Sequence, residues 1–368
     1  MKKALLITNK IRKIPGGSVE TVINPLKDRG YSVTWAANFS TAKFDLKDFP
    51  CDILKTKSET NPFSFKNIQT RKIIKNYLKN NDVDLIFCST PIGGVHGRMC
   101  SKYVNKVIYQ AHGFLFFKGG PKLGFFYKWV EKFLAKKTDA IITINEEDFE
   151  SAKTFKLKKK ENVFLVNGSG EDYVSAPLGE EKRKSLRNEL DIKNNDFVFI
   201  SIGQLNKNKN VLNTVKAFHK AFAGKENYKL LICGEGKQGK KISKYITDHK
   251  LVNKVSLLGY RNDVRDLLQI SNCYISSSLR EGLSRTVGES MMCGLPCIVS
   301  NKRGLNDWVD ENGGLLFNPK SVKDICLAMQ MIQNKDLKLI GEHNKRKVQE
   351  FSSKIVVSQM EEIFDKVL

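Results

Sequence analysis

The sequence predicts an α/β protein with two Rossmann-like domains that face each other across a cleft. The chain has 368 residues, a length that two domains of ordinary size fill more readily than one. Along it, short apolar runs of strand length alternate with amphipathic stretches of helix length, and this alternation occurs twice. Each strand–helix series predicts one doubly wound parallel sheet.

The first series fills the N-terminal half of the chain. Residues 67–80 and 125–136 predict crossover helices, because their apolar residues recur at helical spacing. Buried parallel strands are predicted at residues 3–8, 33–37, 85–88, 107–110 and 140–144.

The second series begins near residue 197 and predicts a second domain. Its strands are expected at residues 197–202, 229–233, 255–258, 273–276 and 296–299. The intervening residues 167–181 are rich in glycine and proline and indicate a linker. We therefore expect an N-terminal domain of residues 1–176 and a C-terminal domain of residues 177–352. A last helix, residues 353–368, is expected to pack back on the N-terminal domain.

The charge balance is strongly basic, with a formal net charge of +23 at pH 7. Such a charge favours anionic partners, which include nucleic acids, acidic lipid surfaces and phosphorylated small molecules. A lysine-rich surface also serves simple solvation, so charge alone does not choose among these partners.

Cysteine usage and hydropathy indicate a cytoplasmic protein without a metal site. The cysteines are scattered through apolar segments of the sequence, which is typical of reduced, buried thiols. Cys293 and Cys297 have no second Cys or His pair at zinc-ligand spacing, so we expect no metal there. No apolar run approaches the roughly 18 residues that cross a bilayer, so no transmembrane helix is expected.

Loops that follow the strands are the expected ligand sites, because open α/β sheets bind ligands beyond the carboxyl ends of their strands. Gly16 and Gly17 follow the first strand and precede a helix expected to begin near Ser18. Such a turn suits an anion, or is an ordinary tight turn with a serine cap. His112 directly follows a strand and precedes Gly113, which suits either a cleft-facing or a structural histidine.

A glycine motif in the second half suggests an alternative function. Gly234, Gly236 and Gly239 match the G-x-G-x-x-G pattern of dinucleotide-binding proteins. That fingerprint also needs an acidic residue at the end of the next strand, where this chain has Tyr260 and Arg261. An NAD-dependent oxidoreductase therefore remains an alternative with only partial support.

The loop that follows the strand at residues 197–202 is basic. Lys207 and Lys209 lie just before a helix expected to begin at Val211. Lysines there complement a diphosphate as point charges, or form a solvated basic loop.

The segment from Glu281 to Glu289 is the most informative stretch of the sequence. A strand is followed by a loop and then by a helix that begins at about residues 284–286 and ends at Gly294. Carboxylates suit hydroxyl-rich ligands, and the N–H groups at the helix start suit phosphate. A ligand with hydroxyls at both ends and a diphosphate in the middle fits this arrangement, and a nucleotide sugar is such a ligand. The alternative is that the two glutamates are surface acids on either side of a helix start.

The same segment resembles the E-x7-E hallmark of the retaining family-4 glycosyltransferases of GT-B fold. Four further segments are similar in sequence to the corresponding segments of bacterial capsule and exopolysaccharide enzymes: residues 89–95, 111–114, 118–119 and 142–148. The likeness covers nearly the whole chain.

The resemblance implies transfer of a sugar, with retention of configuration, from a UDP-sugar to a lipid-linked saccharide in capsule, exopolysaccharide or O-antigen synthesis. It assigns the acceptor to the N-terminal domain and the donor to the C-terminal domain. A polyprenyl-diphosphate-linked saccharide and an anionic membrane surface are the implied partners. No cofactor and no obligatory metal are expected, because Lys209 and helix dipoles stabilise the leaving group.

The resemblance also implies roles for individual residues. Glu281 is expected to contact the transferred sugar, His112 to lie beside the reaction centre, and Glu289 to contact the ribose. Many family members have arginine where this chain has Gln204, so either Lys207 or Arg285 compensates for the missing charge or the diphosphate is bound more weakly than is usual in the family. The implied donor-binding residues are Gly16, Gly17, Gly203, Gln204, Lys209, Gly234, Tyr260, Arg261, Ser284, Arg285, Thr286, Val287 and Glu289.

A segment rich in aromatic residues and lysine, residues 114–129, suits a membrane interface or a helix packed on the sheet. Together with the net charge it predicts peripheral binding to the inner face of the cell membrane. A nucleic-acid-binding protein is a further alternative that rests on charge alone, without a specific recognition motif.

Overall fold

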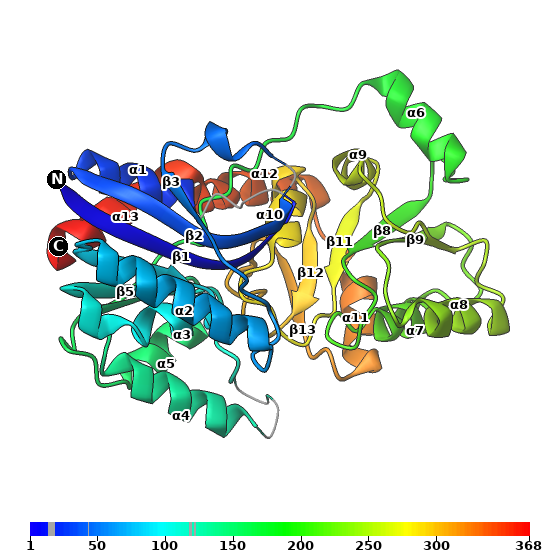
Figure 1. Cartoon of the computed structure of the whole chain (residues 1–368). Coiled ribbons are helices and arrows are strands. Elements are labelled where there is room, and N and C mark those ends of the chain that lie inside the picture. Colours follow the sequence, from blue (N-terminus) through cyan, green and yellow to red (C-terminus); the bar gives the residue numbers. More distant parts are fainter. Residues whose placement is uncertain (14–18, 43, 118–119, 121–122) are drawn as a thin grey trace. The chain divides into compact units, whose positions relative to one another are not determined.

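The protein consists of two compact units in a computed structural model (Figure 1). The structure describes residues 1–13, 19–42, 44–117, 120 and 123–368. Unit 1 comprises residues 1–172 and 351–368, and unit 2 comprises residues 173–350. The sequence places these divisions at residues 176 and 352, so the structure sets them a few residues earlier.

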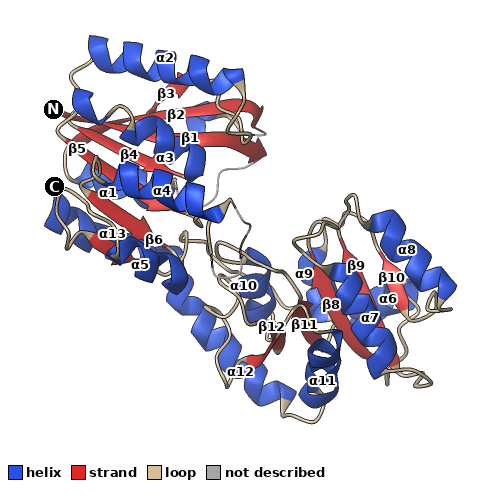
Figure 2. Ribbon diagram, turned by 90° about the horizontal axis from the view of Figure 1, so that it is seen from below, coloured by secondary structure: helices blue, strands red, loops and turns tan. Residues whose placement is uncertain are grey.

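Unit 1 contains a seven-stranded parallel sheet in the order β3-β2-β1-β4-β5-β6-β7 (Figure 2). Its strands are β1 (Lys2–Lys13), β2 (Tyr31–Ala42), β3 (Asp52–Lys55), β4 (Leu85–Ser89), β5 (Lys106–Ala111), β6 (Ala140–Thr143) and β7 (Val163–Leu165). The first six follow the strand order of dinucleotide-binding Rossmann sheets.

Helices cover both faces of this sheet, and their buried side chains form its core. The helices are α1 (Glu20–Asp28), α2 (Phe65–Asn80), α3 (Pro91–Arg98), α4 (Gly124–Ala135), α5 (Glu146–Lys153) and α13 (Ser353–Val367). Ile74 of α2, Ala135 of α4 and Ala152 of α5 join one apolar cluster with strand residues such as Leu5 and Ile86. These three helices therefore share a face.

The C-terminal helix α13 belongs to unit 1 and packs beside α1. The Phe364 ring lies edge-on to that of Phe87 in β4, with centroids 6.0 Å apart. Arg29, just after α1, donates from Nε to Asp365 Oδ1 at 3.0 Å. The end of the chain thus completes the face opposite α2.

Unit 2 repeats this architecture with a six-stranded parallel sheet in the order β10-β9-β8-β11-β12-β13. The strands are β8 (Phe197–Ile202), β9 (Tyr228–Cys233), β10 (Val255–Leu257), β11 (Cys273–Ser276), β12 (Cys297–Ser300) and β13 (Gly314–Phe317). The helices are α6 (Glu180–Glu189), α7 (Val211–Ala221), α8 (Gly239–Asp248), α9 (Val264–Gln269), α10 (Arg285–Met292), α11 (Val322–Ile332) and α12 (Leu337–Lys347).

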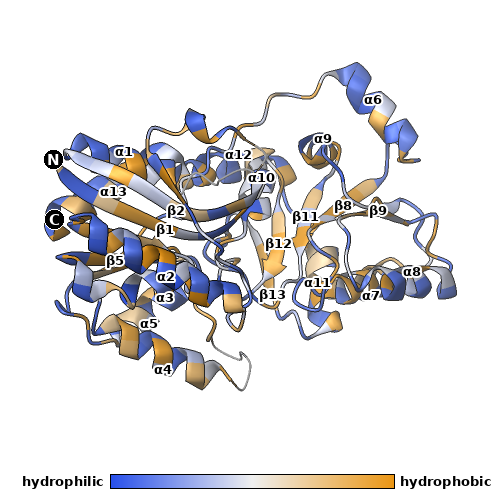
Figure 3. Ribbon diagram, in the orientation of Figure 1, coloured by the Kyte–Doolittle hydropathy of each residue, from blue (hydrophilic) through white to orange (hydrophobic). Residues whose placement is uncertain are grey.

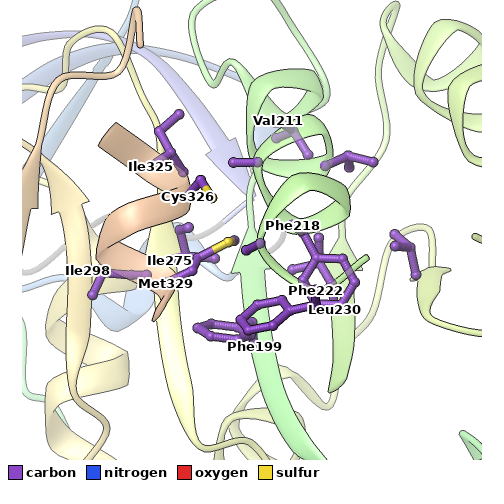
Figure 4. Close-up of a cluster of buried hydrophobic side chains, with 14 of the residues drawn as sticks. Phe199, Val211, Phe218, Phe222, Leu230, Ile275, Ile298, Ile325, Cys326 and Met329 are labelled. Carbon is purple, nitrogen blue, oxygen red and sulfur yellow. The ribbon is translucent and has the colours of Figure 1, made fainter. Parts of the chain in front are cut away.

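The main core of unit 2 lies between its sheet and helices α7, α8 and α11. Figure 4 shows Phe199 of β8 beside Phe218 of α7 and Phe222, the residue that follows α7, with Ile275 and Met329 nearby. The rings of Phe199 and Phe222 have centroids 5.6 Å apart. These contacts hold β8 and β11 in place from one side.

Three strands were not predicted from the sequence: β3, β7 and β13. Each is the last strand at one side of its sheet and is three or four residues long. Asp52 and Lys55 of β3 are exposed, and the short apolar runs of β7 and β13 are incompletely buried, so none of the three is fully buried as a central strand is. Within the described ranges, no helix has the length and hydropathy needed to cross a bilayer.

Candidate functional site

The two strands at the centre of the unit 2 sheet, β8 and β11, are neighbours in space but not in sequence. The strand order reverses between them, and ligands of open α/β sheets bind at such a switch point. The loop after β8 carries Lys209, and the loop after β11 carries Glu281. Lys209 Nζ lies 2.8 Å from Glu281 Oε1, with 20% and 17% of the two side chains exposed.

Hydrogen bonds to backbone carbonyls hold these two loops together. The Leu279 N–H donates to the carbonyl of Asn208 at 2.8 Å, and Asn208 Nδ2 donates to the carbonyl of Arg280 at 3.0 Å. Ser277 Oγ donates to the carbonyl of Lys209 at 3.2 Å. The asparagines of this lysine-rich loop therefore have a structural role that its polar sequence did not reveal.

The glycines of the G-x-G-x-x-G motif are explained by packing between loops. A Cβ on Gly234 would collide with the carbonyl oxygen of Gly203, and one on Gly236 would lie 2.5 Å from that of Leu205. The Leu205 N–H also donates to the carbonyl of Glu235 at 2.9 Å. Close approach of two loops thus accounts for Gly234 and Gly236 without a bound dinucleotide.

A cavity of about 600 Å³ opens beside these loops in unit 2. It brings together five of the residues expected to bind the donor, which follow β8, β9 and β10 in the sequence. Those five are Gly203, Gln204, Gly234, Tyr260 and Arg261. Cys233 and Glu235 also line the cavity and were not predicted, because a thiol and an acid beside a glycine motif have no distinctive pattern.

The charge of Arg261 is engaged by carboxylates of its own unit. Its Nε and Nη2 donate to Asp263 at 2.8 Å and 2.6 Å, and Nη1 lies 3.2 Å from Glu189. Hydrogen bonding to Asp263 raises the pKa of Arg261 above its usual range. Arg261 therefore forms a fixed wall of the cavity, and its charge is already offset.

Helix α10 begins beside Glu281, as the sequence predicts, with Ser284 as its N-cap. Thr286 Oγ1 lies 2.8 Å from the hydroxyl of Tyr274 and 3.2 Å from that of Ser284. The Val287 side chain is fully buried, so only its backbone can face a ligand. The first N–H groups of a helix lack intrahelical partners, and they suit a phosphate.

Glu289 lies in the middle of α10 and forms an ion pair with Arg285, one turn earlier, at 3.3 Å. Both carboxylates of the Glu281–Glu289 segment are thus within ion-pair distance of a basic side chain. Gln204 is exposed at the cavity, and its Oε1 accepts from Asn206 Nδ2 at 3.3 Å. Of the two basic residues expected to compensate for the missing arginine, Arg285 is already paired with Glu289.

The predicted residues of unit 1 are only partly described. His112 follows β5; its side chain is partly exposed, but its Nε2 is buried and has no hydrogen-bond partner in the described structure. Burial lowers the pKa of His112 to about 4, so the imidazole is neutral at pH 7. Gly16 and Gly17 lie outside the described residues, as do Ser18, Lys118 and Gly119.

Family models match both halves of the chain. Residues 18–145 match the model described as "Glycosyl transferase 4-like". Residues 182–348 match the model described as "Glycosyl transferases group 1". This second match contains every element that builds the site of unit 2.

Relatives and solved structures agree with these matches. A Bacillus subtilis protein named as a glycosyltransferase, EpsD, is 28% identical over 92% of this chain and 90% of its own length. An Escherichia coli UDP-Gal:alpha-D-GlcNAc-diphosphoundecaprenol alpha-1,3-galactosyltransferase is 29% identical over 74% of this chain and 72% of its own. Anabaena HepE, solved with UDP, matches the fold with a TM-score of 0.79 at 19% identity, over 100% of both chains.

Two Rossmann-like units, matches to glycosyltransferase models in both halves and a whole-chain likeness to HepE lead to one assignment. The chain is an enzyme, a glycosyltransferase of GT-B fold.

Proposed function

We propose that this enzyme transfers a hexose from a UDP-sugar to a polyprenyl-diphosphate-linked saccharide, with retention of anomeric configuration, in synthesis of a bacterial surface polysaccharide. The observation that carries the proposal is the meeting of Lys209, Glu281 and the start of α10 beside a cavity of about 600 Å³. The E. coli relative is named for transfer from UDP-Gal to a diphosphoundecaprenol-linked sugar, and HepE was solved with UDP-glucose.

The donor is proposed to span the loops of unit 2. The nucleoside would occupy the cavity next to Gly203, Gly234 and Tyr260, and Glu289 would accept hydrogen bonds from the ribose. The diphosphate would face Lys209 and the first N–H groups of α10, where a positive charge and a helix dipole coincide. Glu281 would accept hydrogen bonds from hydroxyls of the sugar.

The reaction needs stabilisation of the leaving nucleoside diphosphate more than it needs a strong base. As the bond from the sugar C1 to the diphosphate oxygen breaks, negative charge grows on that oxygen, next to Lys209 and α10. The acceptor hydroxyl then bonds to C1 on the same face, and its proton passes to the departing diphosphate. Neutral His112 is proposed to accept a hydrogen bond from a substrate hydroxyl. We propose that the reaction needs neither a cofactor nor an obligatory metal.

We also propose that α4 binds the anionic lipid surface at the inner face of the cell membrane and holds the enzyme there. Phe125, Trp129 and Phe133 of α4 are 75%, 63% and 43% exposed. The rings of Trp129 and Phe133 are stacked, with centroids 6.1 Å apart. Lys132 and Lys136 border a groove of about 410 Å³ beside these rings. Figure 3 shows apolar and polar residues alternating along this helix, a pattern that suits a membrane interface.

A transfer assay tests the proposal. Wild-type enzyme is incubated with radiolabelled UDP-hexoses and a short-chain polyprenyl-diphosphate-linked GlcNAc, and the anomeric configuration of the product is read by NMR. We expect transfer with retention that persists in EDTA, and loss of transfer in Glu281→Ala and Glu289→Ala. Glu311→Ala, an exposed acid elsewhere in unit 2, serves as the control and keeps wild-type activity. Wild-type turnover in both site variants, or an inverted product, would contradict the proposal.

A further inference from the structure

The Lys209–Glu281 ion pair joins the group proposed for the diphosphate to the group proposed for the sugar. The distance between Nζ and Oε1 is 2.8 Å. A diphosphate that binds Lys209 must therefore share the ammonium with Glu281 or displace the carboxylate from it. The pairing makes recognition of the two ends of the donor interdependent.

The backbones on both sides of this ion pair are held in place. The Lys209 N–H donates to Asn206 Oδ1 at 2.9 Å. The Glu281 N–H donates to the carbonyl of Arg303 at 3.1 Å, and Arg303 Nε donates back to the carbonyl of Glu281 at 3.0 Å. Exchange of partners at the ion pair thus requires rotation of two side chains and no movement of either loop.

We propose that Glu281 competes with the diphosphate of the nucleotide for Lys209, and that this competition weakens binding of the spent nucleoside diphosphate. The inference rests on the proposed function and deepens it by assigning a means of product release. With an intact donor, hydroxyls of the sugar supply hydrogen bonds to Glu281, so the carboxylate loses nothing when Lys209 turns to the diphosphate. After transfer those hydroxyls are gone, and a buried carboxylate without a partner is unfavourable. Glu281 then returns to Lys209.

The expected size of this competition follows from the exposure of the pair. Both side chains are mostly, but not fully, removed from water. Ion pairs near a protein surface change an equilibrium constant by up to about fivefold. Removal of the Glu281 charge should therefore tighten UDP binding by about twofold to fivefold, although the same change abolishes sugar transfer.

The matched control is a second lysine–acid pair at the opposite end of the same sheet. Lys229 Nζ lies 3.1 Å from Asp191 Oδ2, near the starts of β9 and β8. Asp191→Asn removes the same charge from unit 2 and takes the ion-pair partner from Lys229, whose Nζ still donates to the carbonyl of Asn253 at 2.8 Å. Asparagine also tolerates the positive φ of 50° at this position. A general effect of net charge would tighten UDP binding in this variant too.

Isothermal titration of UDP into the full-length protein tests the inference. We expect tighter UDP binding in Glu281→Gln and in Glu281→Ala, and wild-type affinity in Asp191→Asn. Lys209→Met should bind UDP weakly, and the double variant Lys209→Met/Glu281→Gln should match it, because the competition needs the lysine. Far-UV circular dichroism of each variant confirms that it is folded.

The outcomes separate this inference from the proposed function. If wild-type protein binds no nucleoside diphosphate, the proposed function fails and takes the inference with it. If wild-type protein binds UDP but both Glu281 variants bind it equally or more weakly, the competition alone is overturned. Equal tightening in Asp191→Asn also overturns the competition, because it assigns the effect to net charge.

Discussion

The side chain of Lys209 lies across the backbone of Gly203, the first residue after β8. A Cβ on Gly203 would lie 3.1 Å from Lys209 Cε and 3.5 Å from Nζ. Gly203 also has a φ of +148°, a backbone conformation that residues other than glycine rarely adopt. The glycine therefore sets the path by which the lysine reaches Glu281.

Gly203→Ala should weaken binding of UDP by roughly tenfold, because the added methyl group displaces the lysine stem and its charge. Gly224→Ala is the matched control. Gly224 also has a positive φ, of +73°, but an added Cβ there meets nothing within 4 Å. Calorimetric titration of UDP into both variants makes the comparison. Equal affinity in the two variants would show that Gly203 does not position Lys209.

Helix α4 is anchored to unit 1 by a buried ion pair. Arg98 Nη1 of α3 lies 2.7 Å from Glu131 Oε2, and the guanidinium carbon lies 3.8 Å from the centre of the Tyr109 ring. The Arg98 side chain is fully buried. Glu131→Gln should lower the free energy of unfolding by about 3 kcal/mol, because it leaves a buried charge without its counter-ion.

Urea denaturation measures this loss. Glu150→Gln, which breaks the exposed Lys153–Glu150 pair, is the control and should change stability by less than about 1 kcal/mol. A Glu131→Gln variant as stable as the control would contradict the anchoring role of Glu131.

Burial of His96 in α3 makes the stability of the folded protein depend on pH. The side chain is 1% exposed, neither ring nitrogen has a hydrogen-bond partner in the described structure, and burial lowers its pKa from 6.5 to about 4. The unfolded chain therefore binds a proton that the folded chain excludes. This contribution to stability is present above about pH 6.5 and is lost as the pH falls toward 4.

Between pH 7 and pH 5, the His96 contribution to the free energy of unfolding should fall by roughly 2 kcal/mol. His96→Phe keeps the ring, removes the titration, and should be close to neutral at pH 7 because no hydrogen bond is lost. The variant should therefore be more stable than wild type at pH 5. Urea denaturation at both pH values measures this, and an unchanged pH dependence would contradict it.

Trp129 should contribute strongly to membrane binding if α4 is the docking helix. Trp129→Glu removes an exposed aromatic ring and adds a charge that anionic lipid repels, so binding to phosphatidylglycerol vesicles should weaken tenfold or more, on the order of 1.4 kcal/mol. Leu339→Glu changes an equally exposed apolar residue on α12, at 61% against 63%, and should have little effect. Vesicle sedimentation distinguishes the two variants, and equal losses would contradict docking through α4.

The sequence predicts the elements that carry the site better than their contacts. Gly294 is predicted to end α10, because a glycine with a proline two residues later is a local signal for the end of a helix. In the structure α10 ends at Met292, and Gly294 has a φ of +75°. The contact between Lys209 and Glu281 has no local signal. It joins residues that are far apart in the chain, and it depends on the placement of β8 next to β11.

Partial burial explains the other differences. The strands β3 and β13 lie at sheet edges, where one side of the backbone has no partner strand and residues such as Asp52 and Leu316 stay exposed. Arg261 illustrates the same limit in the site. Its position at the cavity follows from the strand before it, but its ion pair with Glu189 depends on packing of α6 near α9.

The central claim is that unit 2 holds a nucleoside diphosphate sugar through Lys209 and α10, and thermal unfolding with a panel of ligands tests it most directly. A ligand that binds only the folded state raises the melting temperature by an amount that grows with the ratio of ligand concentration to Kd. We predict a rise with UDP and UDP-hexoses, no rise with NAD, and loss of the UDP effect in Lys209→Met. A rise with NAD alone, or an undiminished UDP effect in Lys209→Met, would contradict the account.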